Sequence, residues 1–546
     1  MPNKSIRKNP AQAREERPQI TLREETKFAM AAAVLLVTGS LIYCARHNLL
    51  LLYGDAVAHL NIARRIFDSL NPGFRQLGSV WLPLPHLLML PFVQRADWWQ
   101  SGLAGAIPSM ASYVLACVGI YSLARQWLRP LFAAVVFLAF ALDPGLLYMS
   151  VTAMTEPLFL ALMIWSAVHL TAFESALRKK DPLDARVALF KLTLVLVAAV
   201  FTRYDGWILG TLAWILAAYW TVRHRWWRER VNGQVFVLCT VLLLAAPVAW
   251  LAYNWRIYGD PLDFLRGPYS AMAIARRTTK PGASPYPGWH NVWVAFLYYV
   301  KSAKMGAAPA YCGRWLLLMA AGGTAYALRV FRGSALPAAI LFWMPVPFYA
   351  YSVAYGSVPI FIPVWLPRAF YNTRYGMEML PVFALFPAFA MLAVAKKRPQ
   401  WDRGIAAFAA FLVVASSALL MHSTPLVLQE AKANSATRLP FEQALASRLM
   451  LLPPQSTLMM YTSAHIGALQ QIAFPLRQTI NEGDYQLWTR ALADPAAAAN
   501  FIVALQGDPV SDAVKRHPQN LQLLFLICST GQPCARIYRS TERPPN

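Results

Sequence analysis

Residues 28–59 read FAMAAAVLLVTGSLIYCARHNLLLLYGDAVAH. The segment 28–45 is apolar and contains no Asp, Glu, Lys or Arg. A run of about 20 such residues is long enough to cross a hydrocarbon core about 30 Å thick. Asp55 follows this run closely, ahead of an amphipathic stretch and a proline-rich stretch at 81–86. We therefore expect a first membrane helix that is followed, at its outer end, by the carboxylate of Asp55.

The whole chain shares this apolar character. Its 546 residues are 57% hydrophobic and only 14% charged, whereas a soluble protein carries about 25% charged residues. Many windows of about 20 residues are nearly free of charge. No alternating pattern typical of an outer-membrane barrel competes with this interpretation. The composition predicts a polytopic α-helical membrane protein.

The formal net charge of +24 would by itself suggest nucleic-acid binding. The basic residues, however, stand in short loops between apolar segments: Arg7, Lys8, Arg14, Arg17; Arg125, Arg129; Arg178, Lys179, Lys180; Arg223, Arg225, Arg228, Arg230; Arg329, Arg332; and Lys396, Lys397, Arg398. This is the positive-inside pattern, so we expect cytoplasmic loops and no nucleic-acid partner. Residues 1–27 are expected to be a cytoplasmic tail before a retained signal anchor, because the apolar run shows no cleavage site.

Placing these loops inside predicts about eleven membrane helices, with the N-terminus inside and the C-terminus outside. Large outer loops are expected at 46–102 and 253–308. Residues 82–94 are interpreted as an interfacial or re-entrant segment, because proline interrupts a short apolar run. The helical domain is expected to cover 28–422, with helices at 28–45, 103–124, 130–147, 155–175, 187–203, 207–222, 233–252, 311–329, 335–353, 376–395 and 404–421.

From about residue 423 the composition changes, and charges become frequent and nearly balanced. Residues 423–546 are expected to form a small α/β domain on the periplasmic face, with a helix at 485–499 and strands at 457–462, 501–505, 521–527 and 535–538. Cys528 and Cys534 flank a short turn sequence, which makes a hairpin disulfide plausible. The other four cysteines lie in or beside apolar segments and are expected to be small core residues.

Asp55 and His59 are four residues apart, so they share one face if 55–70 is a helix. Three uses are open for the pair: a base or acceptor-positioning pair, half of a metal site, or plain helix capping by Asp55. Two potential ligands are too few to argue for a metal ion.

Two further carboxylates stand at outer helix boundaries. Asp143 precedes Pro144 at the end of one expected helix, and Glu156 precedes Pro157 at the start of the next. Both patterns are ordinary boundary signals. The functional alternative is that Asp143 and Glu156 face the same cavity as Asp55, where one carboxylate accepts a proton and another holds the substrate.

Two arginines stand at outer helix junctions. Arg203 begins RYDGW (203–207), and Arg374 with Tyr375 belongs to TRYG (373–376). Arginine at a membrane boundary often only snorkels, and Arg203 has a nearby partner in Asp205. Arginine also binds phosphate oxygens through two hydrogen bonds. Phosphate contact is therefore a candidate role for both.

The outer loop at 253–308 is cationic, against the positive-inside trend, and includes Lys301 and Lys304. Binding of an anionic head group would explain an excess of cations on this side. A solvated loop beside anionic membrane lipid is the alternative.

The motifs occur in a recognisable order: an Asp just after the first helix, a proline-rich end to the first loop, TEPLF (155–159), RYDGW (203–207), NWRIYGDP (254–261) and RYGMEMLP (374–381). In this order they resemble the GT-C membrane glycosyltransferases, especially the branch of protein O-mannosyltransferases and lipid A aminoarabinose transferases. The resemblance covers about 30–422. It implies sugar transfer from a polyprenyl-phosphate-linked donor on the periplasmic face of a bacterial inner membrane.

The resemblance also implies that Asp55 is the catalytic carboxylate. From the residues themselves we add Glu156 and Asp143 as supporting carboxylates, and as substrate contacts His59, Arg203, Arg374, Tyr375, Lys301 and Lys304. A single displacement would invert the anomeric centre. The acceptor is left open between a glycan, a lipid and a protein.

The sequence departs from the family pattern in two places. Ala56 follows Asp55, where protein mannosyltransferases typically have Asp-Glu, and no Asp-x-Asp favours a metal-dependent branch. We therefore expect a metal-independent reaction without a cofactor. A transporter or flippase of a lipid-linked saccharide is the alternative, but it predicts ionisable residues near helix midpoints and two related halves. A non-catalytic envelope assembly factor is a further alternative.

Overall fold

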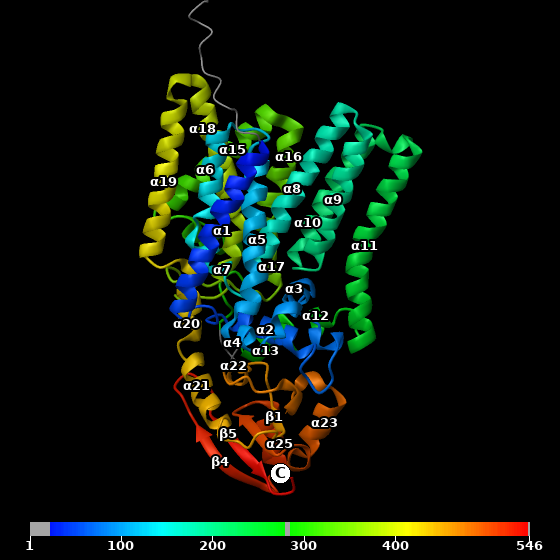
Figure 1. Ribbon diagram of the computed structural model, residues 1–546, viewed down its shortest axis with the longest axis vertical. Coiled ribbons are helices and arrows are strands. Elements are labelled where there is room, and N and C mark those ends of the chain that lie inside the picture. Colours follow the sequence, from blue (N-terminus) through cyan, green and yellow to red (C-terminus); the bar gives the residue numbers. More distant parts are fainter. Residues whose placement is uncertain (1–21, 279–283, 544–546) are drawn as a thin grey trace, which may run out of the picture.

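The computed structural model describes residues 22–278 and 284–543. It consists of a bundle of upright helices with a smaller domain of strands and short helices at one end (Figure 1). Residues 1–21, which make up most of the expected cytoplasmic tail and include Arg7, Lys8, Arg14 and Arg17, lie outside the described residues.

Each expected membrane helix corresponds to one helix or to a pair divided at a proline. The pairs are α6–α7, divided at Asp143-Pro144, and α16–α17, divided at Pro345; proline lacks an N–H and clashes with the preceding turn. Seven stretches of the described chain are long and apolar enough to cross a membrane, so this is a multi-span membrane protein. The helices are α1 (Leu22–Arg46), α5 (Leu103–Ala124), α6 (Pro130–Ala141), α7 (Pro144–Met149), α8 (Glu156–Lys179), α9 (Pro182–Val200), α10 (Asp205–Arg223), α11 (Arg230–Tyr258), α15 (Cys312–Phe331), α16 (Leu336–Trp343), α17 (Pro345–Tyr355), α18 (Leu380–Lys397) and α19 (Asp402–His422).

The basic loops share one end of the bundle. The connections α5–α6, α8–α9, α10–α11, α15–α16 and α18–α19 lie at the end away from the domain of strands (Figure 1). The segments between α1 and α5 and between α11 and α15 lie at the opposite end, next to that domain. The alternation of helix directions agrees with the threading predicted from charge.

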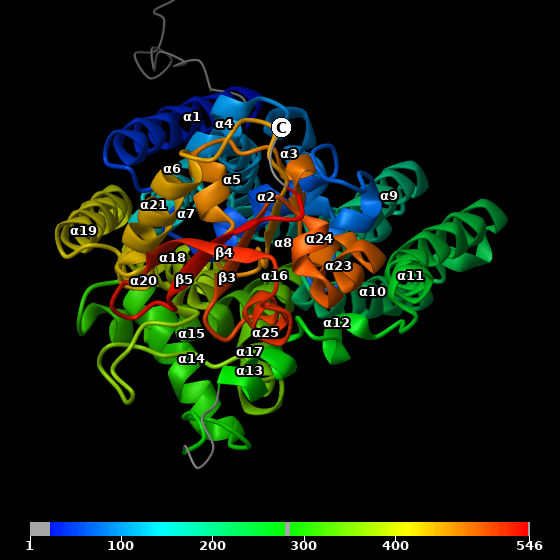
Figure 2. The same ribbon diagram turned by 90° about the horizontal axis from the view of Figure 1, so that it is seen from below.

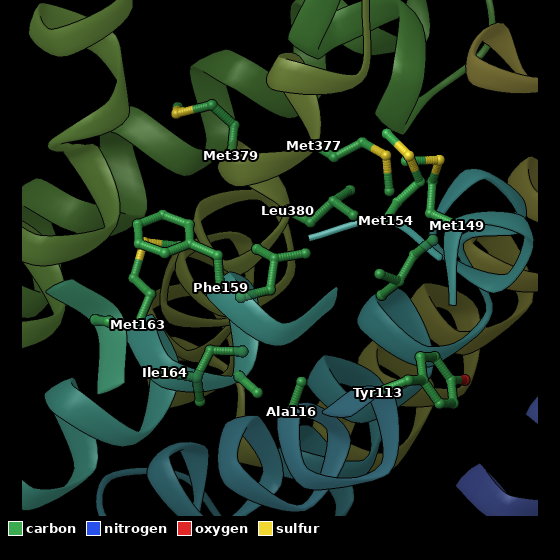
Figure 3. Packing of buried hydrophobic residues seen from close by; sticks show 14 of the residues in the cluster. Tyr113, Ala116, Met149, Met154, Phe159, Met163, Ile164, Met377, Met379 and Leu380 are labelled. Atoms are coloured by element: carbon green, nitrogen blue, oxygen red, sulfur yellow. The ribbon is translucent and has the colours of Figure 1, made fainter. Parts of the chain in front are cut away.

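Apolar packing holds the bundle together. The side chains of Tyr113 in α5 and of Phe159 and Ile164 in α8 are fully buried where these two helices pack together (Figure 3). A Cβ added to Gly119 of α5 would stand 2.9 Å from Cγ2 of Ile164, so α5 and α8 approach closely because this position has no side chain. Small residues of this kind bring membrane helices into van der Waals contact, which is the main attraction available in lipid.

The first outer segment is helical. It contains α2 (Gly54–Arg65), the 3₁₀ turn η2 (Phe74–Leu77), α3 (Leu84–Val93) and α4 (Ala96–Ser101). With ten residues, α3 is about 15 Å long, half the thickness of a hydrocarbon core. This length is too short to cross such a core, and the interfacial or re-entrant placement of 82–94 stays a prediction.

The second outer segment, predicted as a large outer loop, also contains helices. Besides α12 (Asp263–Arg266) and α13 (Ala271–Thr278), it contains α14 (Val292–Ala307), a helix of 16 residues. α14 packs against α17 and against the 3₁₀ helix η5 (Thr373–Met379). Lys301 and Lys304 interrupt its apolar pattern, which is why the sequence did not indicate a helix there.

The terminal domain contains a five-stranded sheet of order β2-β1-β3-β5-β4, which lies across the end of the bundle (Figure 2). β1 pairs in parallel with β2 and β3, whereas β5 is antiparallel to β3 and β4. The elements are α20 (Leu426–Ser435), α21 (Arg438–Leu449), β1 (Leu458–Met460), α22 (Gly467–Gln471), η7 (Leu476–Gln478), β2 (Thr479–Ile480), η8 (Glu482–Asp484), α23 (Gln486–Ala493), α24 (Pro495–Ala498), β3 (Phe501–Leu505), α25 (Pro509–Arg516), β4 (Leu521–Ile527) and β5 (Ala535–Ser540).

The predicted strands are all present, and two of them have the predicted bounds. The predicted helix at 485–499 is divided into α23 and α24 at Asp494-Pro495. Cys528 and Cys534 form the predicted disulfide, with an S–S distance of 1.99 Å. Cys312, which was expected in the core, is exposed.

Candidate active site

Two arginines gather five carboxylates at the end of the bundle that faces the terminal domain. Arg374 comes from η5, and Arg203 from the turn between α9 and α10. Each contacts three carboxylates, and one is shared. We call these seven residues the arginine–carboxylate cluster: Asp55, Glu156, Arg203, Asp205, Arg374, Glu378 and Glu430.

Arg374 links Asp55 to the interior. Its Nη2 donates to Oδ2 of Asp55 at 2.6 Å, and its Nε donates to Oε1 of Glu156 at 3.1 Å. Its Nη1 lies 3.6 Å from Oε1 of Glu430. A planar guanidinium that contacts three carboxylates is held in one orientation. The guanidinium of Arg374 that binds Asp55 is therefore fixed in place.

Arg203 contacts only buried carboxylates within the cluster. Its Nη1 lies 3.3 Å from Oε1 of Glu156, its Nε 3.1 Å from Oδ2 of Asp205, and its Nη2 3.2 Å from Oε1 of Glu378. The Tyr349 hydroxyl accepts from Nη2 at 2.8 Å. The same hydroxyl lies 2.6 Å from Glu378 Oε1 and 3.0 Å from Asp205 Oδ2, so its single proton ties two carboxylates together.

The Tyr375 ring lies between the two guanidinium groups. The Cζ atoms of Arg203 and Arg374 are 5.3 and 5.1 Å from its centroid. Tyr375 also stacks on Tyr349 at 4.9 Å, and Tyr349 stacks on Tyr299 at 4.9 Å. Two like charges are thereby separated by an aromatic face that attracts both. The structure gives Tyr375 this spacing role, and the substrate contact predicted for it stays a prediction.

Glu430 positions the turn that carries Arg374. Its carboxylate accepts from the backbone N–H of Asn372 at 2.7 Å and of Thr373 at 2.9 Å, and from the Thr373 hydroxyl at 2.5 Å. Glu430 belongs to α20, beyond the predicted domain boundary at 423. The start of the terminal segment is therefore part of this cluster, and nothing in the local sequence indicated it.

Exposure separates Asp55 from the other carboxylates of the cluster. Its side chain is 41% exposed, whereas those of Glu156, Asp205, Glu378 and Glu430 are at most 2% exposed. Asp55 lies in the first turn of α2, but the N-cap position is Tyr53 and has no side-chain capping bond. Of the uses left open for Asp55, helix capping is thus not the one that its geometry supports.

His59 is buried in α2, where its ring contacts His86 and Trp81. Its Nδ1 lies 2.8 Å from Nε2 of His86, and its ring packs 4.4 Å from that of Trp81. Burial, together with the charges of Arg374 and Arg203, lowers the pKa of His59 to about 3. A buried neutral imidazole does not bind phosphate as a cation; the substrate contact predicted for His59 stays a prediction.

Asp143 is not part of the cluster, in contrast to the prediction that it faces the same cavity as Asp55. It is the N-cap of α7, and its Oδ1 accepts from the backbone N–H of Leu146 at 2.8 Å. The side chain is buried. The ordinary boundary interpretation therefore holds for Asp143, whereas Glu156 joins both arginines.

Lys301 and Lys304 lie on α14, which packs against η5. Lys301 Nζ is 5.9 Å from the Trp365 ring. Partial burial, and then the charges of Lys301 and Arg314, lower the pKa of Lys304. Neither lysine forms an ion pair with a carboxylate of the described residues. Lys301, Lys304 and Arg314 are thus close enough for their charges to interact, and they could bind an anionic group together.

No group of three or more His, Cys, Asp or Glu in the described ranges is arranged to hold a metal ion. Asp55 and His59 have no third such residue grouped with them in the described ranges. The cations close to Asp55 are guanidinium groups.

The arrangement of the helices and the small terminal domain matches the fold of a solved membrane protein. The chain is similar to ArnT from Cupriavidus metallidurans in a crystal structure bound to undecaprenyl phosphate, with 15% identity, a TM-score of 0.53, and coverage of 96% of this chain and 100% of that one. The apo structure of the same ArnT matches with 15% identity, a TM-score of 0.50, and coverage of 95% and 99%. An oligosaccharyltransferase from Archaeoglobus fulgidus matches with 12% identity, a TM-score of 0.38, and coverage of 88% and 69%.

No protein-family model matches the sequence. No curated protein matches it either.

Proposed function

We propose that this protein is an inverting glycosyltransferase that moves a sugar from a polyprenyl-phosphate donor to an acceptor hydroxyl. The observation that carries the proposal is one exposed carboxylate, Asp55, bound to an otherwise buried arginine–carboxylate cluster. The likeness in fold to an ArnT crystallised with undecaprenyl phosphate supports the choice of donor.

In the proposed reaction, Asp55 removes the proton from the acceptor hydroxyl. The oxygen then forms a bond to the anomeric carbon, and the bond from that carbon to the phosphate oxygen breaks. The lipid phosphate leaves with the electron pair, and the proton stays on Asp55 until solvent removes it. Because a single displacement occurs, the anomeric configuration inverts.

Arg374 acts in this proposal as the fixed partner of Asp55. Its hydrogen bond at 2.6 Å orients the carboxylate before substrate arrives. Glu156 and Glu430 hold Arg374 from the other side. A charge that is already oriented needs no reorganisation at the moment of reaction, and this lowers the barrier.

Lys301, Lys304 and Arg314 are the proposed contacts of the departing phosphate. They lie on α14 and at the start of α15 and form no ion pair among the described residues. Fixed cations would stabilise the negative charge that develops on the leaving group. We propose that these side chains perform this task without a metal ion or a cofactor.

The proposed location is the inner membrane of a bacterium, with the N-terminus in the cytoplasm and the terminal domain in the periplasm. The support comes from the basic loops, which share the end of the bundle away from Asp55. Positive loops remain preferentially on the cytoplasmic side. Asp55 would then work at the periplasmic face.

Mass spectrometry of the lipid that copurifies with the protein tests the choice of donor. We expect a polyprenyl phosphate or its glycosylated form. Incubation with synthetic polyprenyl-phosphate sugars and lipid extract should then yield free polyprenyl phosphate and a product of inverted configuration by NMR. Absence of both the lipid and any transfer across hexosyl and pentosyl donors would contradict the proposal.

A further inference from the structure

A second concave site lies away from Asp55, in the terminal domain. It is a cavity of about 550 Å³, within the range of roughly 300–1,000 Å³ that small-molecule sites occupy. Tyr461 and His465 line it from the segment after β1, and Gln506 and Asp508 from the segment after β3. Arg277 of α13 contributes from the second outer segment, so the cavity lies where the terminal domain meets the membrane domain.

The topology of the sheet explains why a cavity forms here. β1 and β3 are parallel neighbours, and the chain leaves β1 toward β2 on the other side. The connections after β1 and β3 therefore diverge at their carboxyl ends. In open α/β sheets, ligands bind in the crevice that such a divergence leaves.

The charges around the cavity are balanced. Arg277 and Arg516 line it together with Asp508 and Asp512. Asp508 also closes the N-terminus of α25, since its Oδ1 accepts from the Ser511 N–H at 2.6 Å. The backbone donors that would hold a phosphate are thus already occupied by a carboxylate. A phosphate or another anion does not fit this lining.

The lining suits a neutral ligand with many hydroxyl groups. Carboxylate, guanidinium and the amide of Gln506 supply both acceptors and donors. Tyr461, whose ring centroid lies 6.4 Å from that of Trp488 in a stacked arrangement, adds an aromatic wall beside Pro509 and Pro533. A sugar ring has an apolar face and many hydroxyl groups, so its site needs an aromatic or apolar wall and several polar groups that point inward.

A peptide has no backbone to pair with at this position. Peptides that bind sheets add a strand to an exposed edge. β1 is paired on both sides, with β2 and β3, and β3 is paired with β1 and β5. The edges of the sheet are β2 and β4, away from the carboxyl ends that line the cavity.

Hydrogen bonds of Arg438 connect the terminal domain to the segment before Asp55. His465 Nδ1 lies 3.7 Å from Glu442 Oε1, and Arg438 Nη1 donates to Glu442 Oε2 at 2.7 Å. Arg438 Nη2 donates to the carbonyl oxygens of Leu51 and Leu52, at 2.9 and 3.1 Å. Arg438 and Glu442 belong to the terminal domain, so these hydrogen bonds tie that domain to the backbone just before Asp55.

We infer that this cavity binds a neutral saccharide portion of the acceptor and thereby holds the acceptor beside the membrane surface. The inference rests on the proposed transferase function. It assigns to the terminal domain the recognition of the acceptor, while the arginine–carboxylate cluster performs the chemistry.

Binding of neutral trisaccharides to the full-length protein in detergent tests the inference. The probes are maltotriose, mannotriose and chitotriose, followed by calorimetry. At least one should bind, and Arg516→Ala should weaken its binding by roughly tenfold or more, since a lost hydrogen bond from a charged group costs about 1.5–3 kcal/mol. Arg539→Ala is the matched control, because Arg539 is exposed on β5 and is not part of the lining.

Three outcomes would overturn the inference: no trisaccharide binds, glucose 1-phosphate or a short peptide binds in preference through Arg516, or Arg516→Ala and Arg539→Ala have equal effects. The Asp55→Asn variant should bind the trisaccharide as the wild-type protein does. Saccharide binding without any transfer from a donor would instead count against the proposed function, so the two failures are distinguishable.

Discussion

Arg203 and Arg374 each bind three carboxylates, but only Arg374 binds one that is open to solvent. Their side chains are 14% and 10% exposed, for Arg203 and Arg374, and each contacts three carboxylates. Arg203 meets only groups closed to solvent, whereas Arg374 meets Asp55, whose side chain is 41% exposed. The comparison teaches that an ion-pair network marks a candidate site only where one of its charges remains open to a substrate.

Removal of either arginine should give the largest effect on stability. Arg374→Ala or Arg203→Ala leaves three carboxylates without their common cation, which costs about 3–5 kcal/mol for a broken buried pair. We expect a large fall in the thermal unfolding midpoint in detergent for both variants. Equal stability of variant and wild-type protein would show that the network does not hold this end of the bundle together.

The buried imidazole of His59 in α2 predicts a pH dependence of stability. The pKa of His59 is lowered to about 3, below the usual 6.5, so the unfolded chain takes up a proton that the folded protein excludes. The stabilisation is complete above pH 6.5 and is lost as the pH falls toward 3, by about 2 kcal/mol at pH 5.

Unfolding measured at pH 7.5 and pH 5 should therefore show a smaller loss for His59→Gln than for the wild-type protein. His517→Gln, at an exposed position on the terminal domain, should keep the wild-type dependence. The same loss in all three proteins would contradict a buried neutral His59.

Tyr349→Phe removes the hydroxyl shared by Asp205 and Glu378 without changing the ring that stacks on Tyr375. We expect a loss of stability of about 1.5 kcal/mol, because two buried carboxylates lose a donor. Turnover should change less than stability does, since no exposed group is touched. A variant that is stable but inactive would place this half of the cluster in the chemistry.

Replacing each arginine by lysine distinguishes the role of Arg374 in turnover from the role of Arg203 in stability. Lysine keeps the charge but not the planar set of donors. Arg374→Lys should lower turnover by roughly tenfold, since one charge-assisted hydrogen bond to Asp55 is weakened. Arg203→Lys should mainly lower the unfolding midpoint. If Arg203→Lys lost more turnover than Arg374→Lys, the assignment of the two roles would be reversed.

The sequence predicted the elements better than their assembly. Strands 501–505 and 521–527 were placed correctly because apolar residues fill short runs between turn signals. Each membrane helix was indicated by its apolar length. α14 was missed because two lysines interrupt its pattern, and the helix at 485–499 was placed without allowing for Pro495.

The candidate site depended on contacts that no local pattern contains. Asp55 and Arg374 are 319 positions apart, and Arg374 and Glu156 are 218 apart. Glu430 and Tyr349 had no motif to single them out, and Asp143 matched a motif while serving only as a helix cap. Local chemistry therefore indicated which residues were candidates, and only the fold decided which of them meet.

The measurement closest to the central claim is sugar transfer by Asp55→Asn, with donor binding measured in parallel. Asparagine keeps the shape of the side chain but removes the base, so turnover should fall by about 10²–10⁴-fold while the donor still binds. Asp97→Asn, at an exposed carboxylate on α4 that pairs only with Arg95 among the described residues, should keep wild-type turnover. Undiminished transfer by Asp55→Asn would contradict the account.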